Sequence, residues 1–232
     1  VRFALQMTPE AFAQAGQVIL AVGVVSALYG AFAALAQSDL KKMIAYTSIN
    51  HMGYVVMGVA VAALTVDLRI RTIALDGATL QMVSHGLVTG ALFFLLGMLQ
   101  DRAHSRDMSE FGGLLGRVPW LGWSFILMAF ASLGLPGLAH FPAEFQVFLA
   151  TLNTAPWAII AILAIVVTAG LYLRAIAAVF LGSENEKWLE MRDLDRREKL
   201  VIVPLLILTV LVGVAPGWLI DMIHTTMASL SF

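Results

Sequence analysis

The sequence predicts an all-α protein, a polytopic transmembrane helix bundle of about six spans with one discontinuous helix. Of the 232 residues, 60% are hydrophobic and 12% are charged, whereas soluble domains carry about 25% charged residues. The apolar segments are each close to the ~20 residues that cross a bilayer, and one of them contains a dense group of helix breakers. Lipid must therefore be the solvent for most of the surface.

Composition excludes several classes of function. The formal net charge is −1, so we expect no nucleic-acid partner. The absence of cysteine excludes thiol ligands for metals or iron–sulfur clusters and excludes disulfide bonds. The sequence shows no metal-ligand spacing, nucleotide-binding glycine loop or nucleophile with an obvious base, so we predict neither a metal site nor a catalytic centre. Because the chain begins at Val1 without a signal pattern, we expect a fragment of something longer.

Six apolar segments follow one another along the chain. Pro9 after Thr8 is typical of a helix start ahead of the first segment. A loop is expected at residues 65–74, and residues 183–199 form the most charged stretch. Pro204 lies near the start of the last segment, where proline is tolerated. The spans are predicted at residues 16–36, 40–64, 75–99, 120–150, 155–181 and 200–219.

Polar side chains gather inside the second and third spans. His51 lies in the first half of the second span. In the third span Gln81, His85 and Thr89 are spaced four residues apart, so they share one helix face. Polar side chains this dense in a membrane helix are expected to face protein or water rather than lipid.

The fourth span contains too many breakers for one continuous helix. His140 and Glu144 lie beside them. Broken helices at mid-membrane line ion sites in transporters, so we predict a functional break here. The alternative is a loop between two short buried helices of a soluble protein. The predicted break residues are Gly134, Pro136, Gly137 and Pro142.

These polar residues favour proton translocation over the binding of a bulky substrate. Histidine titrates near neutrality, and a proton relay needs such groups joined by hydroxyls, amides and water. We predict a pathway through Glu144, His85 and His51, although His51 could simply bond to a neighbouring helix. Arg174, in the fifth span, could instead reach the interface by snorkelling. Supporting roles are predicted for Lys41, Lys42, Gln81, Thr89, His140 and Arg174.

Basic residues predict the orientation. The loops after the first, third and fifth spans hold ten of them and the opposite side holds three, so the first side should face the cytoplasm or matrix and both chain ends the outer side. His104 and His224 are expected in a solvated loop and tail. The ten are Lys41, Lys42, Arg102, Arg106, Arg117, Lys187, Arg192, Arg196, Arg197 and Lys199, and the three are Arg2, Arg69 and Arg71.

Residues 36–53 read Ala-Gln-Ser-Asp-Leu-Lys-Lys-Met-Ile-Ala-Tyr-Thr-Ser-Ile-Asn-His-Met-Gly. This stretch resembles the most recognisable part of the antiporter-like, proton-pumping subunits of respiratory complex I. The similarity is strongest to chain M of NADH-quinone oxidoreductase, called NADH dehydrogenase subunit 4 in mitochondria, and it covers nearly the whole chain. Further matching motifs follow in the same order at residues 83–87, 101–108, 112–114, 133–145 and 185–188.

The resemblance implies a family fold of fourteen transmembrane helices, of which this chain holds the C-terminal portion, helices nine to fourteen. Residues 1–182 would be the second of two inverted five-helix repeats, residues 183–199 a charged loop on the cytoplasmic side, and residues 200–232 the last transmembrane helix and tail. Partners would be other membrane subunits of complex I, neighbouring antiporter-like subunits, upstream helices and lipid. NADH, flavin, iron–sulfur clusters and quinone would reside in partner subunits.

The resemblance also implies roles for individual residues. Glu144 would be the carboxylate of the discontinuous helix twelve, implicated in proton release to the outer side, and His85 and His51 would belong to the central polar axis. Pro142 and Ala143 depart from the family's Phe-x-Gly-Glu-Phe pattern, which could shift the break. The membrane would be a bacterial plasma membrane or an organelle inner or thylakoid membrane.

Two other functions compete with this interpretation. A cation/proton antiporter subunit of the multi-subunit sodium type shares the implied fold, but the loop at residues 101–114 resembles chain M and argues against it. A structural membrane scaffold would not require buried ionisable groups, so His85 and Glu144 argue against that function.

Overall fold

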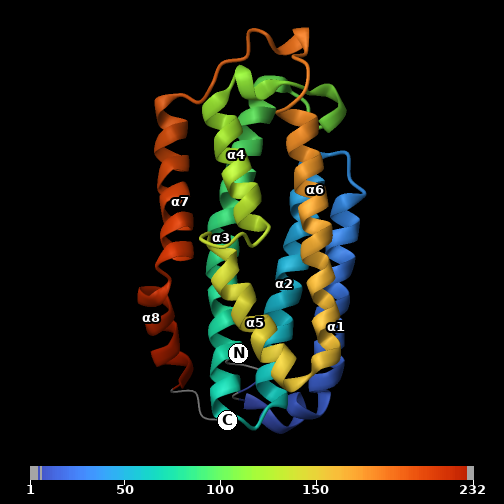
Figure 1. The fold of residues 1–232 in the computed structure, drawn as a ribbon, viewed down its shortest axis with the longest axis vertical. Coiled ribbons are helices and arrows are strands. Elements are labelled where there is room, and N and C mark those ends of the chain that lie inside the picture. Colours follow the sequence, from blue (N-terminus) through green and yellow to red (C-terminus); the bar gives the residue numbers. More distant parts are fainter. Residues whose placement is uncertain (1–4, 6, 229–232) are drawn as a thin grey trace.

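The computed structural model describes residues 5 and 7–228, and its helices run along one long axis (Figure 1). In this described part four helical segments are long and apolar enough to cross a membrane, and a bent pair makes a fifth when it is counted as one span. The predicted all-α membrane bundle is therefore confirmed. Arg2 and tail residues 229–232 lie outside the described residues. The α-helices of the described part are α1 (Pro9–Leu35), α2 (Leu40–Leu64), α3 (Leu68–Ala103), α4 (Pro119–Ser132), α5 (His140–Thr154), α6 (Leu163–Val179), α7 (Arg196–Val214) and α8 (Gly217–Ala228).

Helices α1 and α2 pack with their backbones in close contact. A Cβ atom placed on Gly53 of α2 would lie 2.6 Å from the backbone nitrogen of Ala27, and one on Gly23 of α1 would lie 3.1 Å from the carbonyl oxygen of Gly53. Small residues allow membrane helices to approach this closely. The contact fixes the position of α2, which carries the buried His51.

The predicted interruption of the fourth span is confirmed. Helix α4 ends at Ser132 and α5 begins at His140, and the two follow one another along the long axis (Figure 1). Between them Gly134 and Gly137 have φ angles of +77° and +90°, a region open to glycine because it lacks a Cβ atom. Pro142 was predicted to belong to the break, but it lies in the first turn of α5. Proline is tolerated there because the first backbone N–H groups have no helical partner.

Helix α3 is longer than predicted. It begins at Leu68 and has 36 residues, so the loop expected at residues 65–74 is restricted to residues 65–67. The carboxylate of Asp67 accepts hydrogen bonds from the backbone N–H groups of Arg69 and Ile70 and caps the helix. At ~1.5 Å per residue α3 is about 54 Å long, so both of its ends extend beyond a hydrocarbon core of about 30 Å.

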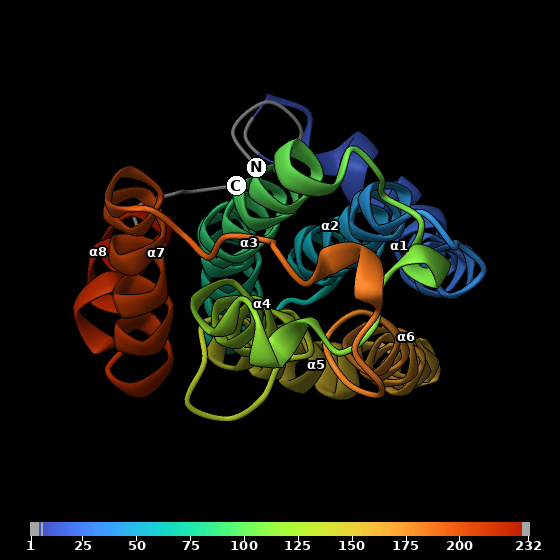
Figure 2. The same cartoon turned by 90° about the horizontal axis from the view of Figure 1, so that it is seen from above.

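The last predicted span, residues 200–219, is wrong as a single helix. The chain bends by 72° between α7 and α8, because Pro216 has no backbone N–H to continue the hydrogen bonding of α7. The two helices form a column at one side of the bundle (Figure 2). This column touches the α4–α5 break, since a Cβ atom on Gly213 of α7 would overlap the backbone of Gly137.

The charged connections gather at the end of the bundle where α3 ends and α7 begins (Figure 1). The guanidinium of Arg102 donates two hydrogen bonds to Glu198, at 2.8 and 2.6 Å. Nζ of Lys187 lies 2.7 Å from a carboxylate oxygen of Glu110. The carboxylate of Asp193 accepts hydrogen bonds from backbone N–H groups in the first turn of α4. These contacts fix the predicted charged loop to the ends of α3 and α4.

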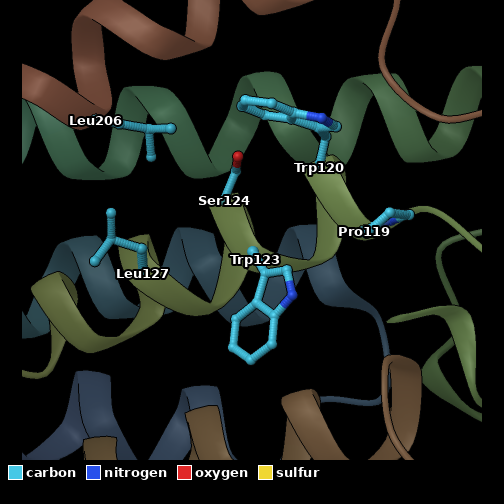
Figure 3. Close-up of a pocket in the computed structure, with 6 residues that line it drawn as sticks. All are labelled: Pro119, Trp120, Trp123, Ser124, Leu127 and Leu206. Carbon is cyan, nitrogen blue, oxygen red and sulfur yellow. The ribbon is translucent and has the colours of Figure 1, made fainter. Parts of the chain in front are cut away.

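An apolar groove of about 350 Å³ lies between α4 and α7 (Figure 3). Trp120 and Trp123 are exposed along it, and Nζ of Lys199 lies 4.5 Å from the ring centre of Trp120. Tryptophan with lysine nearby is typical of a membrane–water interface. None of the groove's residues is ionisable, so we do not assign it a chemical role. It is lined by Pro119, Trp120, Trp123, Ser124, Leu127 and Leu206.

Candidate functional site

Three histidines and one glutamate meet beside the break between α4 and α5. His51 comes from α2, His85 from α3, and His140 and Glu144 from successive turns of α5. The ring centre of His51 lies 4.5 Å from that of His140 and 5.4 Å from that of His85. His85 is half-buried, and the other three are buried. We call these four residues the His–Glu cluster; it unites all three residues of the predicted proton pathway.

Ser132, the last residue of α4, holds two of the histidines. Its Oγ lies 3.0 Å from Nε2 of His51, and its carbonyl oxygen lies 3.4 Å from Nδ1 of His140, which donates to it. The helix ends here, so this carbonyl group has no full set of helical partners. The break thereby supplies both a hydroxyl and a backbone acceptor to the cluster.

Hydroxyl groups extend the cluster on two sides. The hydroxyl of Tyr172 on α6 donates to Oγ of Ser132 at 2.8 Å and lies 3.5 Å from Oγ1 of Thr47. On α3, Oγ1 of Thr89 lies 3.1 Å from Nδ1 of His85. Ser132 and Tyr172 could not be predicted as site residues, because isolated serine and tyrosine residues are common in apolar spans and only the fold brings these two together.

The carboxylate of Glu144 lies against the backbone of the break. A Cβ atom placed on Gly134 would overlap Oε2 of Glu144, so the carboxylate occupies the space that any other side chain would need. Oε1 of Glu144 lies 3.4 Å from Nδ1 of His51. Gly134 therefore forms part of the wall of the carboxylate site as well as part of the interruption of the helix.

Gln81 connects the cluster to the neighbouring part of α3. Its side chain is fully buried, and it lies one turn before His85 on the same helix face. One turn earlier on that face, a Cβ atom on Gly77 would lie 3.1 Å from the carbonyl oxygen of Ala143. This face of α3 therefore packs directly against the first turns of α5; the four-residue spacing predicted the shared face but not the helix that packs on it.

The three basic residues for which we predicted supporting roles lie away from the cluster. Lys41 and Lys42 are exposed in the first turn of α2, about 15 Å along the helix from His51. Arg174 on α6 is exposed and donates to the carbonyl oxygen of Gln37 at 2.6 Å. The structure thus brings Gln81, Thr89 and His140 to the cluster and leaves these three at the polar end.

A second ionisable pair joins α3 to α8. His224 was predicted in a solvated tail; it is exposed, but it lies in α8, and its Nδ1 donates to Oδ2 of Asp76 at 2.7 Å. The side chain of Asp76 is 5% exposed and that of His224 is 56% exposed. Asp76 could have been recognised from the sequence, because burying its carboxylate in an apolar span is costly in free energy, as it is for Glu144. Its partner could not be predicted without the bend between α7 and α8.

Residues 1–172 match the family model described as NADH:quinone oxidoreductase/Mrp antiporter, TM. The chain belongs to this family. It is 35% identical to NADH-quinone oxidoreductase subunit M of Rhodobacter capsulatus over 99% of its length and 44% of that protein's. It is 41% identical to F(420)H(2) dehydrogenase subunit M of Methanosarcina mazei over 87% of its length and 39% of that protein's. The chain therefore spans about half the length of the curated relatives it matches.

Solved structures share the fold. A chain of respiratory complex I from Thermus thermophilus matches with a TM-score of 0.88 and 31% identity, over 99% of this chain and 48% of that one. A chain of the Mrp complex from Dietzia sp. matches with a TM-score of 0.81 and 19% identity, over 94% of this chain and 48% of that one. The second likeness concerns the fold alone. Together they identify the bundle as the antiporter-like fold.

Proposed function

We propose that the chain is part of a membrane subunit of a proton-pumping quinone oxidoreductase of the complex I type, without redox chemistry of its own. The identity to subunits M over almost the whole chain supports this proposal. Partner subunits would supply the electron donor, flavin, iron–sulfur clusters and quinone. The relatives are about twice as long as this chain, so the partners would include further helices of the same subunit.

The observation that carries the proposal is the His–Glu cluster beside an interrupted helix. A neutral imidazole has one nitrogen that donates and one that accepts, so it can pass a proton between two neighbours. The cluster's ring centres are 4.5–6.1 Å apart, which a side-chain rotation or one bridging water can close. We infer that protons move from His85 through His51 or His140 to Glu144.

From Glu144 the proton would leave toward the end of the bundle where α3 begins. Asp76 lies closer to that end than Gln81, by about 7.5 Å along α3. It pairs with the exposed His224, which offers a contact with the surroundings. The basic loops lie at the opposite end, which supports the predicted orientation with this end on the outer side. We infer that the Asp76–His224 pair is the last step of the route.

The second candidate is a cation/proton antiporter subunit of the multi-subunit sodium type. The family description names both classes, and the Mrp likeness is consistent with either. Sodium, like other hard cations, would need a shell of oxygen ligands, whereas the cluster offers imidazoles and a single carboxylate. This chemistry favours protons. The 41% identity to an F(420)H(2) dehydrogenase subunit leaves the electron donor open.

The test is proton pumping in membranes that carry the full complex, normalised to assembled complex. Glu144→Gln keeps size and hydrogen bonding but cannot release a proton, so pumping and coupled quinone reduction should fall while assembly persists. Glu144→Asp should retain part of the activity, and His85→Ala should lose less than Glu144→Gln because water can replace one relay member. Full pumping in Glu144→Gln would overturn the proposed route. Pumping that required sodium would favour the antiporter.

A further inference from the structure

Three buried ligand atoms converge at the centre of the His–Glu cluster. His51, His140 and Glu144 each offer one atom, and these atoms lie within 4.8 Å of one another. Nδ1 of His51 and Oε1 of Glu144 lie 3.4 Å apart, and these two atoms and Nε2 of His140 are buried without a hydrogen-bond partner among the described residues. Buried polar atoms normally have partners, and leaving one unpaired costs about 1–3 kcal/mol. In the tautomers that carry the proton on the nitrogen facing Ser132, the two imidazoles and the carboxylate offer three lone pairs to a positive charge.

Ser132 orients both imidazoles toward this point. Its Oγ lies 3.0 Å from Nε2 of His51, and its carbonyl oxygen accepts from Nδ1 of His140. Each histidine therefore uses one ring nitrogen on Ser132 and leaves the other without a hydrogen-bond partner among the described residues. Histidines that ligate metals are held in this way by an acceptor on the second nitrogen, which fixes the tautomer. The hydroxyl of Tyr172 in turn fixes Ser132.

We propose that His51, His140 and Glu144 form a binding site for a divalent transition-metal ion, with Zn²⁺ as the best fit. Two imidazoles and one carboxylate with a fourth position open to water are a known zinc donor set. Imidazole favours such ions over Mg²⁺ and Ca²⁺, which prefer oxygen. Tetrahedral zinc places its ligands about 3.3 Å apart, so the side chains need to close by roughly 1.5 Å at most.

If the proposed function is right, a metal ion at this site would block the proton route. A zinc ion would occupy the lone pairs of two histidines and the carboxylate that are proposed to carry the proton. Bound zinc should therefore block pumping without removing any part of the complex. The site could not be predicted from the sequence, because two of its ligands lie on α5 and the third, His51, lies on α2, 89 positions before His140.

The binding experiment uses the purified complex with the full-length subunit, incubated for hours with ⁶⁵Zn²⁺ and then freed of unbound metal. We compare the wild type with His140→Asn, which keeps a polar side chain but removes a ligand, and with His140→Cys, which restores one as a thiolate. His104→Asn is the matched control, because His104 is exposed, outside the cluster and in the left-handed conformation that asparagine tolerates.

If the site binds zinc, the measured ⁶⁵Zn²⁺ content should be one ion fewer per complex in His140→Asn than in the wild type, His104→Asn or His140→Cys. Loss of an orienting contact costs 10–100-fold in metal affinity, so loss of a ligand should raise the zinc concentration that half-inhibits pumping by at least ~100-fold. Equal zinc content in the wild type and His140→Asn would overturn the site. This binding measurement is independent of pumping by Glu144→Gln, so failure of the metal site and failure of the proton route are distinguishable.

Discussion

Gly134→Ala should damage the carboxylate site through a contact that can be read directly from the structure. The left-handed backbone at φ +77° costs an alanine about 1–2 kcal/mol of folding free energy. Its Cβ atom would also overlap Oε2 of Glu144, and overpacking of this kind costs typically 1–3 kcal/mol. The flexible carboxylate should give way before the backbone, so Glu144 leaves its position beside His51.

Gly137→Ala is the matched control. Gly137 has a similar φ, +90°, and a Cβ atom there meets nothing within 4 Å, so it pays only the backbone cost. Both variants should lower the amount of assembled complex on native gels, and Gly137→Ala should do so through the backbone cost alone. Only Gly134→Ala should lose pumping per assembled complex. Adding Glu144→Asp to Gly134→Ala should restore part of the pumping, because the shorter side chain holds its carboxylate away from the added Cβ atom. Equal pumping per assembled complex in the two glycine variants would show that a Cβ atom at residue 134 does not disturb the Glu144 carboxylate.

Two further predictions concern the ends of the bundle. Asp76→Asn and His224→Gln should each reduce pumping with assembly preserved, whereas unchanged pumping in both would remove the pair from the route. The hydrogen bond from Lys187 is the main cause that lowers the pKa of Glu110 below its ordinary value. The contribution of Glu110 to loop stability is therefore present above the unfolded pKa and lost as pH falls through the lower folded pKa. As pH falls through this range, the rate of amide hydrogen exchange of residues 105–111, corrected for the intrinsic rate, should rise more in the wild type than in Lys187→Met. Parallel pH curves for the two proteins would contradict this role of Lys187.

The apolar spans and the break could be predicted because they depend on local composition. Span length, the breakers around Gly134 and the position of Glu144 are all visible within about thirty residues of sequence. The face shared by Gln81 and His85 follows from helical periodicity. The boundaries were less accurate, because capping by Asp67 and the first-turn tolerance of Pro142 depend on hydrogen bonds that composition does not specify.

The contacts that define the site could not be predicted, since they join distant parts of the chain. Ser132 acts on His51 and Tyr172, which are 81 and 40 positions away, and Asp76 pairs with His224 across 148 positions. Lys41 was predicted to have a supporting role because it is ionisable and lies at the edge of the second span, but α2 places it about 15 Å along the helix from His51. Which ionisable residues meet depends on how the helices pack.

The central claim is that Glu144 gives up and takes back a proton during turnover. Infrared difference spectra of the complex, recorded between resting and reducing conditions, observe protonated carboxyl groups directly. We expect a carboxyl band in the wild type that disappears in Glu144→Gln, shifts in Glu144→Asp and is unchanged in Glu10→Gln, a variant of an exposed residue at the start of α1. Identical difference spectra in the wild type and Glu144→Gln would contradict it.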